Sequence, residues 1–375
     1  MAVAFRGRPS GMDRIEIAHA RRALGDPAAT LVCRNLWGRY AALPRGMVAQ
    51  VLAAGAEGRR PRRLIARHAL RLALGAGRAE AVAAASRPGA VFSIVSHQGL
   101  EDMRAIESLT RHGAAFVPLI HDIIPITHPE YNRPVQPPRH AGRMLAVSRL
   151  AAGVAYVSAE SRRQAESWMQ AQGRVPPGAV APPGIDLRTR ASPDESGAYF
   201  LTICTLEPRK NHMLLLEVWR ELHARLGTET PRLIFVGRQG WEVEPVRRFI
   251  EAHPHYVDWR GHMGEAELAS LLAGARALLF PSFAEGFGLP VGEALASGVP
   301  VIASDLAVLR EVGGDVPDYL DTLDGLGWLQ AVEDYADPAH PRRLAQLDRL
   351  AGWRAPDWAT HFARFDGLIS ALAAD

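Results

Sequence analysis

Two glutamates, Glu285 and Glu293, stand eight residues apart after a short apolar run. The run from Ala277 to Phe280 predicts a buried strand, and a helix is expected to begin near Phe287 and to carry Glu293 inward. A second apolar segment, Pro300 to Ala303, predicts another strand directly afterwards. This order places both carboxylates at the end of a strand, where open α/β sheets bind ligands.

The residues between the two glutamates suit an anion. Gly286 and Gly288 lack a Cβ, so backbone N–H groups can approach a ligand closely. Free amides and the dipole at a helix N-terminus together favour a diphosphate. Glu285 would repel a phosphate but can accept hydrogen bonds from a neutral sugar, and Glu293 can do the same for a ribose. The simplest assignment is one acid for each sugar of a nucleotide sugar. The alternative is that Glu285 caps the helix and Glu293 lies on a solvated face.

A lone lysine marks a second turn of the same kind. Of the 43 basic residues, only Lys210 is a lysine, and Arg209 stands next to it. The pair follows the apolar strand predicted for residues 199–204 and precedes a helix predicted for residues 213–226. An ammonium and a guanidinium can share a diphosphate between them. This layout indicates phosphate binding; the alternative is a chance lysine on an exposed helix start.

These segments together resemble the retaining family 4 glycosyltransferases, which have the GT-B architecture. The matching residues are Glu285-Gly286-Phe287-Gly288-Leu289-Pro290 with Glu293 and Gly298-Val299-Pro300-Val301, Glu207-Pro208-Arg209-Lys210-Asn211, His121-Asp122-Ile123-Ile124-Pro125 with His128-Pro129-Glu130, and the glycine-containing loop Arg8-Pro9-Ser10-Gly11-Met12-Asp13-Arg14. The resemblance is strongest in residues 198–320. It implies an α/β fold of two Rossmann-like parallel-sheet domains facing a cleft, with a C-terminal helix crossing back to the first domain.

The resemblance also implies roles for individual residues. The catalytic set is His121, Glu285, Arg209 and Lys210. Donor binding falls to Glu293, Gly286, Phe287, Gly288, Leu289, Arg14, Thr205 and Met263, with the base held near Gly237-Arg238 and Arg260-Gly261-His262-Met263. Acceptor binding falls to Asp13, Asp122 and His97. A histidine at a strand end, such as His121, is by itself more often structural.

The implied reaction transfers a hexose, with mannose favoured, from a nucleoside diphosphate sugar to an acceptor hydroxyl with retention. Arg209, Lys210, the amides of residues 286–288 and Arg14 would meet the negative charge of the departing diphosphate. No cofactor is expected, a GDP-sugar is the favoured donor, and UDP and dTDP sugars stay open. The chain contains no Asp-x-Asp, so no metal is expected. One departure is Thr205, because the commonest family pattern has an arginine there; we expect Arg209 to replace its charge.

Alternating apolar strands and helical stretches run through both halves. Strands are predicted at residues 90–95, 116–120 and 154–157, and later at 199–204, 233–236, 256–259, 277–280 and 300–303. A short first strand is predicted at residues 2–5. The proline-rich stretch 176–193 predicts the boundary. The expected domains are an acceptor-binding domain, 1–187 with the helix 358–375, and a nucleotide-sugar domain, 196–357.

Charge divides the chain unequally. Residues 1–190 hold 27 arginines and 13 acidic residues, a balance of +14, which leaves 16 basic and 27 acidic residues, or −11, for 191–375. The densest basic segment is 59–72, in which Leu64, Ile65, His68 and Leu72 could share a helix face. This segment predicts either peripheral contact with an anionic membrane or a solvated helix. Nucleic-acid binding is not expected, because no recognition module is found.

Composition bounds the compartment and the competing functions. The 375 residues fit two domains, and only two cysteines, Cys33 and Cys204, are present. No apolar run approaches the ~18 residues needed to span a bilayer, and residues 1–10 contain no signal-peptide core, so a cytoplasmic protein is expected, at the inner membrane face if the basic segment binds lipid. The acceptor expected is a saccharide, lipid-linked, in polysaccharide assembly. Alternatives are another GT-B enzyme, such as a sugar-nucleotide epimerase or a phosphorylase, and a catalytically silent subunit.

Overall fold

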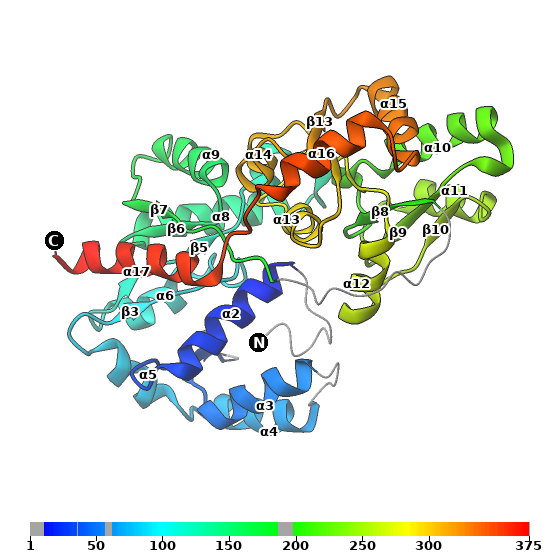
Figure 1. Cartoon of the computed structure of the whole chain (residues 1–375). Helices are drawn as coiled ribbons and strands as arrows, with labels where there is room; N and C mark the ends of the chain where they lie inside the picture. Colours follow the sequence, from blue (N-terminus) through cyan, green and yellow to red (C-terminus); the bar gives the residue numbers. More distant parts are fainter. Residues whose placement is uncertain (1–10, 36, 57–61, 187–197, 375) are drawn as a thin grey trace. The chain divides into compact units, whose positions relative to one another are not determined.

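The computed structural model describes residues 11–35, 37–56, 62–186 and 198–374. It divides into two compact units (Figure 1). The first comprises residues 1–126, 135–183 and 358–375, and the second comprises residues 127–134 and 184–357. The strand expected at residues 2–5 and the loop residues Arg8 to Ser10 lie outside the described residues. The same is true of residues 187–193 in the proline-rich boundary.

The second unit contains a parallel sheet of six strands in the order β10-β9-β8-β11-β12-β13. The strands are β8 (Tyr199–Ile203), β9 (Arg232–Val236), β10 (Val257–Trp259), β11 (Leu278–Phe280), β12 (Val301–Ser304) and β13 (Asp318–Leu320). The first five follow the predicted apolar runs, and β13 was not predicted. Parallel strands covered on both faces are expected to be apolar throughout, and residues 199–202, 278–280 and 301–304 are all buried.

Helices and short 3-10 turns connect these strands. They are η2 (Pro208–Lys210), α10 (His212–Leu226), η3 (Gly227–Glu229), α11 (Glu244–Ala252), α12 (Glu265–Gly274), α13 (Leu289–Ala296), α14 (Ala307–Gly313), α15 (Gly325–Ala336) and α16 (Pro341–Ala351). Trp219 of α10 and Trp328 of α15 are fully buried in the core of this unit.

The direction in which successive strands are added to the sheet reverses between β8 and β11. From β8 the chain proceeds through β9 to the edge strand β10, then returns to β11 beside β8 and proceeds outward through β12 to β13. The loops that follow β8 and β11 therefore leave neighbouring strands toward opposite sides. Such a switch point at the carboxyl edge is where open α/β sheets bind ligands.

The first unit contains shorter strands. The parallel strands are β3 (Val91–Phe92) with β4 (Ala115–Phe116), and β5 (Leu119–Ile120) with β6 (Val154–Tyr156) and β7 (Gly178–Val180). An antiparallel pair, β1 (Val32–Arg34) and β2 (Tyr40–Ala42), was not predicted. The strand expected at residues 116–120 is divided into β4 and β5. Its hydrogen bonds nevertheless continue past Pro118, because the Val117 and Leu119 N–H groups donate to the Phe92 and Ile94 carbonyls over 2.9 and 3.0 Å.

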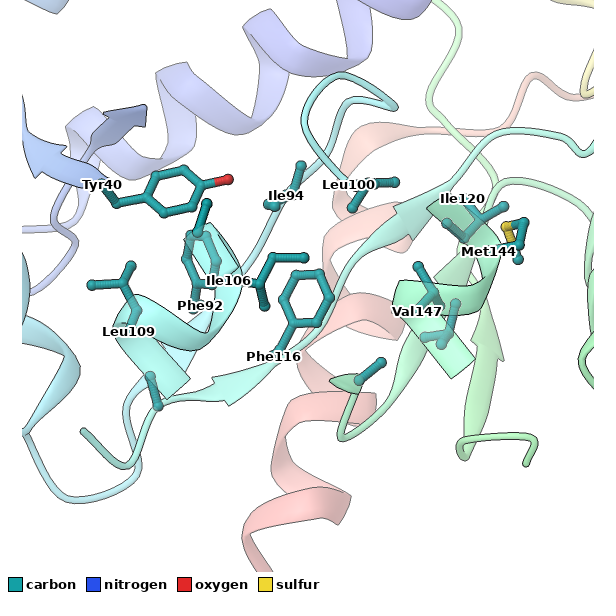
Figure 2. Close-up of a cluster of buried hydrophobic side chains, with 14 of the residues drawn as sticks. Tyr40, Phe92, Ile94, Leu100, Ile106, Leu109, Phe116, Ile120, Met144 and Val147 are labelled. Carbon is teal, nitrogen blue, oxygen red and sulfur yellow. The ribbon is translucent and has the colours of Figure 1, made fainter. Parts of the chain in front are cut away.

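Helices surround these strands: α2 (Gly11–Gly25), α3 (Arg45–Ala56), α4 (Arg62–Ala73), α5 (Arg78–Ala85), α6 (Met103–Thr110), α7 (Ile124–Thr127), α8 (Gln136–Leu150), α9 (Ala159–Gln170) and α17 (Trp358–Ala374). The loop expected at Gly11 to Arg14 is wrong, because these residues form the first turn of α2. Figure 2 shows the core, in which Phe92 stacks on Phe116 with ring centroids 5.6 Å apart.

The final helix, α17, packs within the first unit, as the sequence predicts. Arg22 of α2 forms an ion pair with Asp366. The ring nitrogens Nε2 of His19 and His361 lie 2.8 Å apart, and Nδ1 of His361 lies 2.9 Å from the Ala181 carbonyl oxygen. A carbonyl can only accept, so the His361 proton is on Nδ1 and His19 donates to His361.

Candidate active site

A cluster of two cations and two carboxylates occupies the switch point between β8 and β11. Lys210 Nζ lies 2.5 Å from Oε1 of Glu285, and Arg209 Nη1 lies 3.2 Å from its other oxygen. Arg209 Nη2 also donates to Glu207 over 2.8 Å. The two predicted phosphate ligands and the predicted sugar ligand are thus brought together, although 75 residues separate Lys210 from Glu285 in the chain.

The cluster is largely withdrawn from solvent. The side chains of Lys210 and Glu285 are 10% and 8% exposed. Burial alone would raise the pKa of the Glu285 carboxyl, but the charges of Lys210 and Arg209 outweigh burial and lower this pKa to about 2. Glu285 is therefore a carboxylate over the physiological pH range. It can accept hydrogen bonds and stabilise positive charge, but it has no proton to donate.

The loop backbone is fixed to the cations. Phe283 N–H donates to the Arg209 carbonyl over 2.9 Å, and Arg209 Nη1 donates to the Ala284 carbonyl over 2.5 Å. These bonds hold the two residues before Glu285 against Arg209, the residue before Lys210. Lys210 Nζ also lies 5.1 Å from the centre of the Phe280 ring at the end of β11.

Helix α13 begins at Leu289, the residue directly after Gly288. Gly288 is its N-cap with φ 97°, a backbone conformation that favours glycine, and a Cβ there would come within 2.5 Å of Leu309. Phe287 is buried, and Leu289 is partly exposed. Glu285 does not cap this helix, and Glu293 is only 4% exposed. Both alternatives to a site, a cap and a solvated face, are therefore wrong.

The turn that carries Lys210 is supported from beneath. Asn211 adopts φ 53°, and its side-chain amide donates to the Thr322 carbonyl over 2.9 Å. Cys204 Sγ lies 3.2 Å from Nε2 of His212, the first residue of α10. Burial raises the pKa of the Cys204 thiol to about 12 and lowers that of His212 to about 3, so both groups stay neutral. This pair has a structural role that the sequence did not suggest.

The loops after β9 and β10 form the neighbouring part of the same edge. Gly237 N–H donates to the Gly261 carbonyl over 2.6 Å, and Trp259 Nε1 donates to the Gly237 carbonyl over 2.9 Å. Gly237 has φ 151°, and a Cβ there would lie 1.7 Å from the Cys204 carbonyl oxygen. Met263 is buried at 7% exposure. The segments predicted to hold the base therefore adjoin the β8 loop, where Thr205 is exposed.

A segment from the first half of the sequence belongs to the second unit. Residues 127–134 group with it, and the Tyr131 ring stacks on Phe283 with centroids 5.1 Å apart and an interplanar angle of 4°. Tyr131 follows the His128-Pro129-Glu130 motif directly, and the His128 ring stacks on the Tyr131 ring with centroids 6.1 Å apart. Tyr131 was not predicted from the sequence. An aromatic residue directly after a matched motif could have indicated it.

The first unit brings together His97 and His121, with His140 beside them. His121 N–H donates to Nε2 of His97 over 3.1 Å, and its ring Nε2 donates to the Val95 carbonyl over 2.8 Å. The His97 ring lies 5.1 Å from that of His121 and 4.9 Å from that of His140. Burial lowers the pKa of all three histidines, so they are neutral imidazoles. In this structure the backbone N–H and the ring Nε2 of His121 both form hydrogen bonds at the end of β5.

The remaining predicted residues of the first unit lie on α2 and after β5. Asp13 is buried and Arg14 half-buried in the first turn of α2. Asp122 is half-buried, and its Oδ1 accepts from the Ile124 N–H over 3.0 Å. Among the described residues, no group of three or more His, Cys, Asp or Glu side chains could hold a metal ion. No helix described here is long and apolar enough to cross a bilayer.

The sequence of the second unit matches a known family. Residues 197–334 match the family described as Glycosyl transferases group 1. The second unit contains a glycosyl transferases group 1 domain. The matched range includes the Glu207–Lys210 turn, Glu285 and Glu293.

Curated relatives of this chain include mannosyltransferases. Serotype-specific mannosyltransferase WbdA of Escherichia coli is 30% identical over 277 residues, which cover 66% of this chain and 34% of WbdA. O-antigen chain mannosyltransferase B of Escherichia coli is 36% identical over 162 residues, which cover 41% of this chain and 42% of that protein. The chain thus spans about a third of the length of WbdA.

Solved structures extend the similarity to both units. The GtfA/B complex matches with a TM-score of 0.57 and 18% identity, covering 80% of this chain and 60% of that one. An α,α-trehalose 6-phosphate synthase from Burkholderia multivorans matches with a TM-score of 0.56 and 12% identity, covering 79% and 77% of the two chains. The chain therefore has the GT-B fold of these glycosyltransferases, which confirms the predicted fold class.

Proposed function

We propose that this protein is a retaining glycosyltransferase that transfers a hexose from a nucleoside diphosphate sugar to a hydroxyl of a saccharide acceptor. The observation that carries the proposal is the buried contact between Lys210 and Glu285 at the switch point, with the N-terminus of α13 beginning four residues after Glu285. Mannose on GDP is the favoured donor, because WbdA and O-antigen chain mannosyltransferase B are named as mannosyltransferases.

The cations suit a departing diphosphate. Lys210 has three N–H donors, so it can keep one bond to Glu285 and still donate to phosphate oxygens. Arg209 offers a planar fork, and the amides at the start of α13 add fixed dipoles. These groups are already in place before charge develops, which is the condition for electrostatic stabilisation of a transition state. We expect this diphosphate site to work without a metal ion.

Glu285 suits the sugar. Its carboxylate is ionised at neutral pH and adjoins Lys210 and Arg209, the proposed diphosphate ligands, so we expect the hexose of the donor to lie beside it. It would accept hydroxyl hydrogen bonds and stabilise the developing positive charge of an oxocarbenium-like sugar. Glu293, buried on α13, would accept from the ribose. We assign no covalent nucleophile, and the leaving phosphate would take the acceptor proton.

The first unit would supply the acceptor side. We propose that His121 contacts the donor sugar and that Asp13, Asp122 and His97 contribute to acceptor binding. The acceptor proposed is a lipid-linked saccharide of a cell-surface polysaccharide, because one relative is named as an O-antigen chain mannosyltransferase.

The test is calorimetric binding of GDP, UDP, dTDP and ADP, with and without magnesium, to the wild type and to Lys210→Ala. Arg220→Ala is the matched control, because it removes a cation that is 68% exposed on the same unit. The proposal expects one nucleotide to bind without magnesium and the control to leave this binding unchanged. Lys210→Ala should weaken it roughly 10- to 100-fold, because a hydrogen bond to a charged group contributes about 1.5–3 kcal/mol. If no nucleotide binds, the protein is a silent glycosyltransferase-like subunit and the proposal is wrong.

Product analysis separates the remaining alternatives. With the bound donor and a saccharide acceptor, NMR of the anomeric proton should show a new glycosidic bond with the configuration of the donor. An epimerase would change the sugar nucleotide without an acceptor, and a phosphorylase would require inorganic phosphate.

A further inference from the structure

Three large apolar side chains of the first unit are exposed together at the C-terminal end of α4. Trp37, Leu70 and Leu74 are 73%, 64% and 81% exposed. Trp37 reaches this end of the helix directly, because its indole Nε1 donates to the Ala73 carbonyl over 3.0 Å. We call these three residues the apolar tip. Its indole N–H is already bonded, so the ring could enter an apolar medium without leaving that donor unpaired.

Helix α4 has two opposite faces. Ile65 and Leu72 are buried against α3 and β2, with Leu64 partly buried beside them, as the sequence predicts for this segment. At 100° per residue, Leu70 and Leu74 lie on the side opposite this buried pair. The apolar tip is therefore not part of the core of the first unit.

Arginines share the exposed face with the tip. Arg63 and Arg67 precede Leu70 and Leu74 on the same side of α4, and Arg71 lies beside them. All three arginines are exposed, and none forms an ion pair with a carboxylate in the described ranges. Residues 58–79 contain seven arginines and no acidic residue. The face is thus cationic along the helix and apolar at its end.

We propose that this face docks the protein on an anionic lipid bilayer, with the apolar tip inserted among the acyl chains and Arg63, Arg67 and Arg71 at the headgroups. A bilayer surface offers both partners at once: phosphate charges in one layer and an apolar medium a few ångströms deeper. A nucleic acid would satisfy the arginines but would leave the two leucines in water. The proposal does not depend on the transferase activity, because lipid binding needs neither donor nor acceptor.

The experiment is flotation of the whole chain with phosphatidylcholine vesicles, with and without phosphatidylglycerol. The variants are Leu70→Gln/Leu74→Gln for the tip and Arg63→Gln/Arg67→Gln for the cations. The matched control is Leu323→Gln/Leu326→Gln, because these leucines are 78% and 77% exposed on the second unit. The control therefore matches the tip variant, because both replace two large exposed leucines. Circular dichroism and thermal unfolding of each variant, including Arg63→Gln/Arg67→Gln, would test whether it is folded.

The proposal expects binding to the anionic vesicles only. Removing the two arginines should weaken vesicle binding roughly 30-fold, because each cation contributes a factor of about five. Removing the two leucines should weaken vesicle binding at least roughly 10-fold. The control should bind as the wild type does. Equal loss in the control, unchanged binding in either test variant, or binding to duplex RNA that outcompetes the vesicles would overturn the proposal.

Discussion

The contact between Lys210 and Glu285 should contribute measurably to stability as well as to donor binding. We consider Lys210→Met and Glu285→Gln, singly and together, in a double-mutant cycle. The Glu285 pKa falls from 4.5 to about 2 in the folded protein. At about 1.4 kcal/mol per pKa unit, this shift corresponds to ~3 kcal/mol in favour of the ionised, folded state at neutral pH.

Each single change leaves a buried charge without its partner. Lys210→Met leaves the Glu285 carboxylate, 8% exposed, with Arg209 alone. Such losses typically cost ~3 kcal/mol or more, whereas removing both partners costs less than the sum. We therefore expect each single variant to be destabilised by ~3 kcal/mol and the cycle to give a coupling of about 2 kcal/mol.

The assay is urea unfolding at pH 7, followed by tryptophan fluorescence, since Trp219 and Trp328 are buried in the second unit. The control cycle uses Glu217 and Arg220, whose contact is equally short at 2.5 Å but whose side chains are 48% and 68% exposed. We expect a coupling below about 1 kcal/mol there. A Lys210–Glu285 coupling as small as that of the control pair would refute the reasoning that burial strengthens this contact.

The same pair predicts a pH dependence. A carboxyl with a depressed folded pKa contributes stability above its unfolded pKa and loses it as the pH falls. The contribution of Glu285 should therefore be complete above pH 4.5 and should disappear toward pH 2. Glu285→Gln should flatten the stability profile in this window, and an unchanged profile would contradict the assignment.

Three further predictions concern neighbouring features. Glu207→Gln should strengthen GDP binding measured by calorimetry, because Arg209 Nη2 would be released from its 2.8 Å contact, and weaker binding would show that Glu207 positions the guanidinium. Gly237→Ala should lower the free energy of unfolding by ~3 kcal/mol, given φ 151° and a Cβ 1.7 Å from a carbonyl oxygen, while Gly325→Ala, whose Cβ meets nothing closer than 3.8 Å, should be nearly neutral. Burial lowers the pKa of His19 from 6.5 to about 3, so the free energy of unfolding should fall as the pH drops through this range. His19→Gln should reduce the slope of unfolding free energy against pH by about 1.4 kcal/mol per pH unit, and an equal slope in the variant would contradict this prediction.

Much of the second unit could be predicted from the sequence. Its strands β8, β9, β11 and β12 are continuous apolar runs, which a fully covered parallel sheet requires, and polar or glycine-containing turns bound them. The short strand β13 was missed because Asp318–Leu320 has no such run. In the first unit, the apolar run at residues 116–120 is divided into β4 and β5, although the Val117 N–H still donates to the Phe92 carbonyl and the Pro118 carbonyl accepts from Ala155.

The candidate site was predicted in its parts but not in its contacts. Arg209 and Lys210 were expected to share the diphosphate of a nucleotide sugar and Glu285 to bind its hexose, and those roles stay predictions. Their mutual neutralisation, with Glu207 as a second carboxylate on Arg209, was not foreseen. The stacking of Tyr131 on Phe283 was also missed. Local spacing carries no information about these partners, because they are remote in sequence.

By itself, the sequence determined which segments form strands and helices and which turns carry ionisable groups, since apolar periodicity and turn chemistry are local properties. Only the tertiary structure decided that β8 and β11 are neighbours, and this adjacency brings Lys210 within 2.5 Å of Glu285. The protonation of Glu285 follows from that contact, because burial and nearby cations, not the residue type, set its pKa. The order of strands in a sheet is a global outcome of packing, and it created the charge cluster that the proposed chemistry uses.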